Sequence, residues 1–306
     1  MPNMRMTNML RLVCLVTFAA LLSARSAEPV RVVATVSMVA DLVRQVGGER
    51  VSVEALMGPG VDPHLYKATA SDVTRLRRAD VIFYNGLALE GKMVDVLEKL
   101  ARAKKHVHAV TATVPAARLL TPPEFEGHHD PHVWFDVNLW AQCVDAVAKG
   151  LEGFSGKDGV FFRAQAGRVK SRLADLHAWA MARAAELPKG RRVLVTSHDA
   201  YNYFGRAYGF QVVGLQGVST VTEAGLADMA KLVDFIRRRG VKAIFVESSV
   251  SPAAIRRISR DAGVKVGGEL FSDAMGTPGQ MEDGHDLGTY EGMIRHNLNT
   301  IVNALK

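Results

Sequence analysis

A pattern of short apolar strands and amphipathic helices occurs twice in this chain, and the repeat limits the folds that the chain can adopt. The segment 31–35 (RVVAT) begins the first copy, and the segment 192–196 (RVLVT) begins the second, 161 residues later. The strands expected to correspond are 31–35 and 192–196, 51–56 and 210–214, and 80–85 and 242–247. Apolar strands that alternate with helices form parallel sheets, so two copies predict two parallel-sheet α/β lobes.

A long helical segment lies between the two copies. Residues 160–187 carry apolar residues near the helical period, with no proline and no Gly/Ser tract among them. Asp158 is suited to the N-cap, and Pro188 is a stop signal. At about 1.5 Å per residue the helix would reach about 40 Å, enough to run along both lobes as a stiff connector. A surface helix of one lobe is the alternative that this pattern leaves open.

The first residues have the order of a secretory signal peptide. Residues 1–11 carry two arginines and no acid, residues 12–22 are apolar, and residues 23–27 are mostly small and polar. Eleven apolar residues are well short of the roughly 20 that a membrane-spanning helix needs. We expect cleavage after Ser26, and we interpret Cys14 as part of the apolar run rather than as a lipidation site.

These segments predict the domain organisation: a signal peptide at 1–26, an N-terminal α/β lobe at 27–156, a linking backbone helix at 157–188 and a C-terminal α/β lobe at 189–306.

The chain has a net charge of +7, from 38 Lys and Arg against 31 Asp and Glu. Part of this excess belongs to the signal peptide, and the rest is dispersed over helix ends. No basic run carries stacking aromatic residues, which argues against a nucleic-acid partner.

Any metal chemistry in this chain must come from histidines and carboxylates. The two cysteines, Cys14 and Cys143, are too few for a thiolate zinc site, and we expect Cys143 to be a buried small apolar side chain. The tripeptide Asp-Pro-His occurs twice, at 62–64 and 130–132. Asp-Pro bends the chain locally and presents the next side chain at a loop edge, so His64 and His132 are candidate ligands.

Two more candidates come from the second copy of the repeat. His198 follows the strand 193–196, and Asp273 follows a short apolar stretch and lies before a Gly-rich loop. The carboxyl ends of parallel strands face the binding crevice of an open sheet. Three imidazoles and one carboxylate suit zinc, manganese or ferrous iron, and do not suit calcium or copper(I).

Other polar residues near these candidates have ordinary alternatives. Glu247 and Asp199 could act as general bases, but a hydrogen bond to a ligating histidine and a helix cap are the more common roles. His128 and His129 could load metal, or they could belong to a solvated loop. The remaining histidines have no supporting partner in the sequence and are interpreted as surface or core residues: His106, His108, His177, His285 and His296.

Four motifs in this order resemble the metal-binding solute receptors of ABC importers, the zinc and manganese receptors called cluster A-I or cluster 9. The chain looks most like the TroA-type receptors of treponemes. The motifs are MGPGVDPHLY at 57–66, DPHVWFD at 130–136, SHDAYNYF at 197–204 and GELFSDAMG at 268–276. The resemblance runs from about residue 31 to the C-terminus.

The resemblance implies one Zn²⁺ or Mn²⁺ ion per chain, held in a cleft between two lobes joined by a long helix. His64 and His132 would come from one lobe, and His198 and Asp273 from the other. The receptor would be an exported, periplasmic monomer, membrane-tethered if the signal segment is retained, that delivers metal to an ABC permease with a cytoplasmic ATPase and is no enzyme. His198, at a position where manganese receptors often have Glu, favours a zinc receptor or a mixed zinc/manganese receptor. The short segment 124–130, where zinc receptors usually have a long His-rich loop, argues against zinc alone.

Three other functions would use parts of the same pattern. A secreted zinc hydrolase would need three protein ligands and an open water position. A haem or chelate receptor on the same architecture would be expected to have aromatic and arginine side chains at the cleft motifs, where this sequence has imidazoles and carboxylates. A surface adhesin would be expected to have repeats or an exposed aromatic patch.

Overall fold

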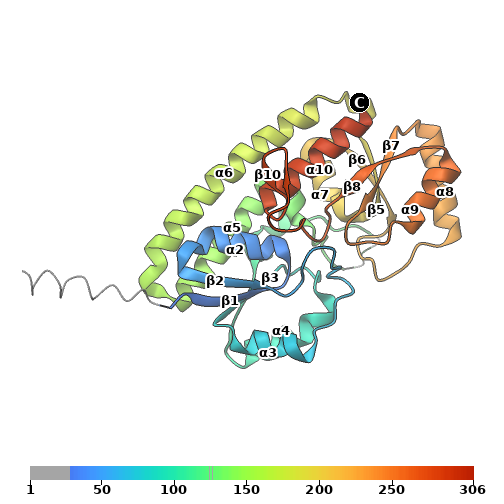
Figure 1. The fold of residues 1–306 in the computed structure, drawn as a ribbon. Helices are drawn as coiled ribbons and strands as arrows, with labels where there is room; N and C mark the ends of the chain where they lie inside the picture. Colours follow the sequence, from blue (N-terminus) through green and yellow to red (C-terminus); the bar gives the residue numbers. More distant parts are fainter. Residues whose placement is uncertain (1–27, 124, 126) are drawn as a thin grey trace, which may run out of the picture.

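The computed structural model describes residues 28–306 apart from 124 and 126, and it consists of two α/β lobes that lie along one long helix (Figure 1). The predicted signal peptide, with Cys14, lies outside the described residues. Among the residues that are described, no helix combines the length and the apolar character needed to cross a membrane.

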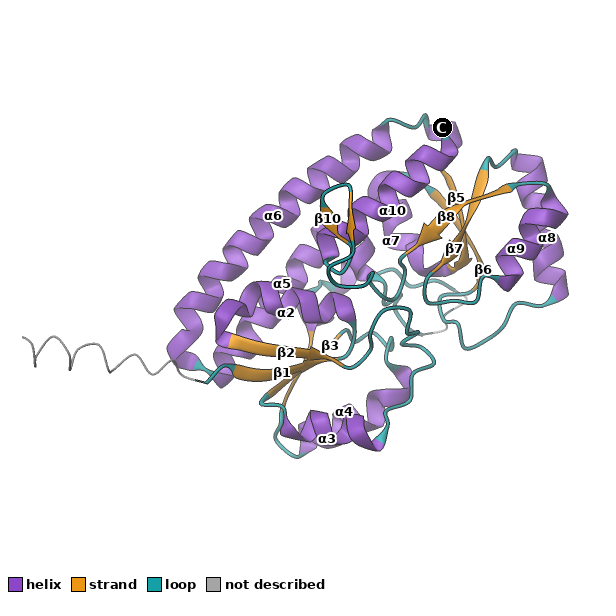
Figure 2. Cartoon of the chain, in the orientation of Figure 1, coloured by secondary structure: helices purple, strands orange, loops and turns teal. Residues whose placement is uncertain are grey.

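The N-terminal lobe is built on a four-stranded parallel sheet. Its strands lie in the order β2-β1-β3-β4, with Val30 of β1 opposite Val51 of β2 and Val81 of β3 opposite His106 of β4. The strands are β1 (Val30–Ala34), β2 (Val51–Ala55), β3 (Val81–Tyr84) and β4 (His106–Ala109). The helices α2 (Ser37–Gly47) and α5 (Val137–Phe154) cover one face, and α3 (Ala70–Arg78) and α4 (Val94–Arg102) cover the other (Figure 2).

The C-terminal lobe repeats this arrangement. The strands β5 and β6 form one parallel pair, β7 and β8 form another, and β5 packs beside β7, so the spatial order β6-β5-β7-β8 matches that of the first sheet. Its strands are β5 (Val193–His198), β6 (Gln211–Gln216), β7 (Ala243–Glu247) and β8 (Lys265–Leu270). Its helices are α7 (Asn202–Tyr208), α8 (Leu226–Arg239), α9 (Ala253–Ala262) and α10 (Tyr290–Leu305). The predicted fold class is confirmed.

The long helix α6 (Gly159–Ala185) joins the lobes. Its 27 residues correspond to about 40 Å, and it packs against α2 and α5 of the first lobe and α7 and α10 of the second (Figure 1). Asp158 occupies the N-cap position, but the cap interaction predicted from the sequence is wrong: the Asp158 carboxylate accepts a hydrogen bond from Ser155 Oγ and caps no helix amide. The residue limits proposed for the two lobes, 27–156 and 189–306, stay a prediction.

The larger of two apolar cores in the described residues runs through both lobes and α6, and the smaller lies within the C-terminal lobe. The larger core includes the fully buried rings of Trp140, Phe162, Tyr203 and Tyr290, which come from different elements on both sides of the long helix. Cys143 is buried on α5, and burial raises the pKa of its thiol, which agrees with the predicted apolar role. A core that crosses between lobes resists large hinge movements, because opening would expose its apolar surface.

Candidate metal centre

Both Asp-Pro-His motifs use their aspartate to fix the histidine two residues later. Asp62 Oδ1 accepts a hydrogen bond from the backbone amide of His64 (2.8 Å), and Asp130 Oδ1 accepts one from the amide of His132 (3.0 Å). Asp130 Oδ1 also lies 2.8 Å from His132 Nδ1. A proline has no amide hydrogen and a fixed φ, so the bend between aspartate and histidine is locally determined.

His198 is placed by the sheet of the C-terminal lobe. The strand β5 runs through His198 itself, which corrects the prediction that the strand ends at residue 196. Glu247, at the end of the neighbouring strand β7, accepts hydrogen bonds on Oε1 from the amides of Ser197 (2.7 Å) and His198 (3.0 Å). Its Oε2 lies 2.6 Å from His198 Nδ1, so Glu247 orients the imidazole and leaves Nε2 facing the other candidate ligands.

Asp199 makes a contact with the neighbouring strand that its position in the sequence does not indicate. Its Oδ1 accepts a hydrogen bond from the amide of Gly214 on β6 (2.7 Å), and this contact holds the turn after His198 against the sheet. The approach is close, because a Cβ atom on Gly214 would lie 2.5 Å from the backbone of both His198 and Asp199.

We therefore expect Gly214→Ala to disturb both folding and the position of His198. Overpacking at a site with no space costs about 1–3 kcal/mol, so the free energy of unfolding in urea should fall by that amount. Gly217→Ala is the matched control, because Gly217 directly follows β6 and its Cβ would meet no atom within 4 Å. Equal stability of the two variants would contradict this account of Gly214.

Asp273 lies in the loop after β8, and both lobes hold that loop. The backbone amide of Phe271 donates to Asn297 Oδ1 on α10 (2.9 Å), and Asn297 Nδ2 donates back to the Phe271 carbonyl (2.7 Å). Trp134 Nε1, from the motif that contains His132, donates to the carbonyl of Ser272 (3.1 Å). These hydrogen bonds from both lobes fix the position of the loop, and therefore of the Asp273 carboxylate, between the lobes.

The structure brings the four predicted candidates together in one buried cluster: His64, His132, His198 and Asp273. One donor atom from each lies within 4.8 Å of the others, and the four residues are at most 3% exposed. His64 Nε2 lies 3.3 Å from His132 Nε2, and the Asp273 oxygens lie 3.3 Å from Nε2 of His132 and Nε2 of His198. Bonds of about 2.0 Å in a tetrahedral site separate neighbouring donors by about 3.3 Å, so these spacings suit one metal ion.

The charges around the cluster are those of a cation site. Burial lowers the pKa of His64 to about 3. Burial also acts to lower the pKa values of His132 and His198, but the carboxylates beside these two histidines have the larger opposite effect. The pKa of His132 is therefore raised, and the pKa of His198 is raised strongly. Burial alone would raise the pKa of Asp273, yet the positive charge of His198 and the contact with His132 hold it well below its usual range.

Unpaired donor atoms give a second indication of what the cluster can hold. Among the described residues, neither oxygen of Asp273 and neither ring nitrogen of His198 has a hydrogen-bond partner; Nδ1 of His198 is in ion-pair contact with Glu247 Oε2 at 2.6 Å. Buried polar atoms without partners are costly, and a divalent cation coordinated by them would remove that cost. The ion would also balance the carboxylates of Asp130, Glu247 and Asp273 in place of protons on the imidazoles.

The other histidines lie outside the cluster. His128 is exposed and packs against Phe125, and His129 Nδ1 lies 3.0 Å from Thr121 Oγ1. His106 and His108 lie on β4, a strand that the sequence analysis did not predict because histidines interrupt its apolar pattern. A role of His128 and His129 in metal loading stays a prediction.

The short strands β9 (Met281–Glu282) and β10 (His285–Asp286) were not predicted from the sequence either.

A second layer of support was missed by sequence reasoning. In the N-terminal lobe, Glu90 is buried and accepts hydrogen bonds from the Asn85 amide (2.7 Å), the Gly86 amide (3.1 Å) and Thr35 Oγ1 (2.6 Å). Asn85 Nδ2 then donates to the carbonyl of Pro131 (3.0 Å), inside the second Asp-Pro-His motif.

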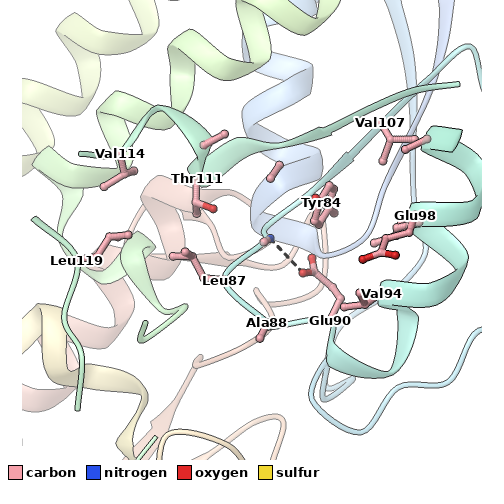
Figure 3. A pocket seen from close by; sticks show the side chains of 15 residues that line it. Tyr84, Leu87, Ala88, Glu90, Val94, Glu98, Val107, Thr111, Val114 and Leu119 are labelled. Atoms are coloured by element: carbon pink, nitrogen blue, oxygen red, sulfur yellow. Dashed lines mark hydrogen bonds between the residues drawn. The ribbon is translucent and has the colours of Figure 1, made fainter. Parts of the chain in front are cut away.

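Glu90 also borders a cavity of about 490 Å³ with a mostly apolar lining, which is drawn in Figure 3. None of the four residues of the cluster lines this cavity.

Comparisons with known proteins agree with this geometry. A family model described as ZnuA, zinc-uptake complex component A periplasmic, matches residues 32–304. The chain is 49% identical over 281 residues to the zinc-binding protein TroA of Treponema pallidum, covering 90% of this chain and 88% of that protein. It is 46% identical over 285 residues to the manganese-binding lipoprotein MntA of Bacillus subtilis, covering 91% and 90%. The solved structure of the periplasmic zinc binding protein TroA from Treponema pallidum aligns with a TM-score of 0.85 at 46% identity, covering 90% of this chain and 99% of that one.

Proposed function

Because the chain belongs to the family of the periplasmic zinc-uptake complex component A, we propose that it captures one divalent transition-metal ion, Zn²⁺ or Mn²⁺, and delivers it to an ABC permease. The ligands in this proposal are His64, His132, His198 and Asp273. The metal is cargo, so the chain acts by binding and release.

One observation carries the proposal: the four donors come from both lobes and meet in a site closed to solvent. A ligand set divided between lobes links metal binding to the approach of the lobes, because the ion gains its full coordination only when they are together. The permease would then recognise the closed form of the receptor, in which the ion is bound.

Elemental analysis tests the proposal directly. Protein purified from its native compartment should contain one zinc or manganese ion per chain, and the metal-free form should take up one equivalent in a competition titration. Absence of both metals, together with no uptake by the metal-free form, would overturn the proposal. The same titration compares the two ions, for which the ligand set alone gives no ranking.

Location and partners follow from the same proposal. The chain would be exported by its N-terminal segment and act in the periplasm, tethered to the membrane if that segment is retained. Its partners would be the transmembrane permease and a cytoplasmic ATPase, and it would act as a monomer without nucleic acid.

The proposal excludes a hydrolase. A catalytic zinc site keeps one position open for water and has three protein ligands, whereas four protein donors converge here. A screen for ester and peptide hydrolysis with zinc-loaded protein should show no activity above that of free zinc, and turnover that depends on His198 would contradict this conclusion.

Metal affinity should fall as the pH falls. An imidazole must lose its proton before it ligates, and the pKa of His198 is raised well above 6.5 by the carboxylates of Glu247 and Asp273, against the effect of burial. Protons therefore compete with metal even at neutral pH, so affinity should still rise between pH 6.5 and pH 8. Calorimetry in buffers of different ionisation enthalpy should show proton release, and unchanged zinc affinity at pH 5 would contradict a histidine-rich site.

A further inference from the structure

The two Asp-Pro-His motifs share a feature that their sequences do not show. In each motif one carboxylate oxygen fixes the histidine, and the other accepts a hydrogen bond from the opposite lobe. Asp62 Oδ2 accepts from Thr220 Oγ1 (2.6 Å), and Asp130 Oδ2 accepts from Asn202 Nδ2 (3.2 Å). Thr220 lies between β6 and α8, and Asn202 begins α7.

Thr220 makes the shorter of these two contacts. Its side chain is directed inward, since the residue is 6% exposed while its neighbour Val221 is 57% exposed. A hydroxyl that donates to a carboxylate at 2.6 Å is a charge-assisted hydrogen bond, which is about twice as strong as a neutral one. Asp62 in turn holds the amide of His64, so two hydrogen bonds connect Thr220 to a candidate metal ligand.

We propose that Thr220 is a positioning residue that holds the His64 loop against the C-terminal lobe and thereby slows metal release. The proposal rests on the proposed function as a metal receptor. The contact joins the two lobes, so it exists only while they are together and stabilises the closed form. The contact cannot form until the lobes meet around the ion, so it should act on dissociation rather than on association.

The test uses zinc-loaded protein, Thr220→Val, Thr220→Ser, and stopped-flow mixing with an excess of a chromophoric zinc chelator. Valine removes the donor and leaves the Asp62 carboxylate without it, so the zinc dissociation rate should increase about tenfold or more. The association rate should stay within about twofold of the original value, because affinity changes of this kind fall mainly on dissociation. Thr220→Ser keeps the hydroxyl and should restore slow release.

A double-mutant cycle with Asp62→Ala shows whether Thr220 acts through Asp62. If it does, Thr220→Val adds little to the dissociation rate when Asp62 is already absent. The proposal is overturned if Thr220→Val releases zinc at the original rate, if Thr220→Ser is as fast as Thr220→Val, or if the valine effect is the same with and without Asp62. Failure of the unaltered protein to bind zinc or manganese would instead refute the proposed function.

Discussion

Replacing any one of the four proposed ligands by alanine is expected to lower zinc affinity by more than about 100-fold. Loss of a residue that only supports a ligand costs 10–100-fold, so loss of the ligand itself should cost more. The four substitutions are His64→Ala, His132→Ala, His198→Ala and Asp273→Ala. Each removes one of the donors that meet within 4.8 Å, and the remaining three cannot move to compensate because their loops are held by buried hydrogen bonds.

The matched controls are His177→Ala and His285→Ala. His177 packs beside Tyr208, and His285 lies on the short strand β10, so both remove an imidazole without touching the cluster. Competition titration against a chelator of known affinity measures the loss, and circular dichroism confirms that each variant is folded. Comparable losses of affinity at the control histidines would refute the ligand assignment.

The candidate site was accessible from the sequence because its candidate ligands are placed by local rules. An Asp-Pro-His tripeptide bends the chain by itself, so two copies identify His64 and His132 without knowledge of the fold. His198 ends β5 and Asp273 lies just after β8, and parallel strands place such residues at the same edge. The repeat of the strand pattern predicted the two sheets for the same reason, since strand formation here follows local apolar runs.

Contacts that depend on distant partners could not be predicted in this way. Glu90 supports Asn85, which reaches Pro131 46 residues away, and Thr220 reaches Asp62 across 158 residues. Nothing in the local sequence of Thr220 distinguishes it from other loop threonines. Asp199 shows the same limit: the close approach of β6 gives its carboxylate the amide of Gly214, a contact that its local sequence does not indicate.

The two lobes hold their candidate ligands by different means. The candidate ligands of the N-terminal lobe lie on bends whose aspartates face the other lobe, whereas His198 ends the strand β5 and its partner Glu247 ends the neighbouring strand β7 of the same lobe. The C-terminal lobe therefore presents His198 on a rigid support whether or not the lobes are together. Substitution of Glu247 should consequently affect binding through the imidazole itself rather than through closure.

Glu247→Gln is expected to weaken zinc binding about 10–100-fold while the fold is kept. Glutamine can keep an oxygen toward the amides of Ser197 and His198, but it then presents its NH₂ group to His198 Nδ1. Nδ1 must accept that hydrogen bond, so the ring proton moves to Nε2, the atom that faces Asp273 at 3.3 Å. A protonated Nε2 cannot ligate, and binding then requires the less favoured tautomer.

The matched control is Asp41→Asn, which also neutralises a buried carboxylate. Asp41 accepts hydrogen bonds from Gln45 Nε2 (2.6 Å) and the Tyr290 amide (3.2 Å), and the hydrogen bonds of the four candidate ligands do not involve it. Asp41→Asn should leave zinc affinity unchanged, and Glu247→Gln should also lower the pKa of His198 in the metal-free protein, measured by NMR titration, because the adjacent negative charge that raises it is gone. If Glu247→Gln binds zinc as tightly as the original protein, the carboxylate does not set the tautomer of His198.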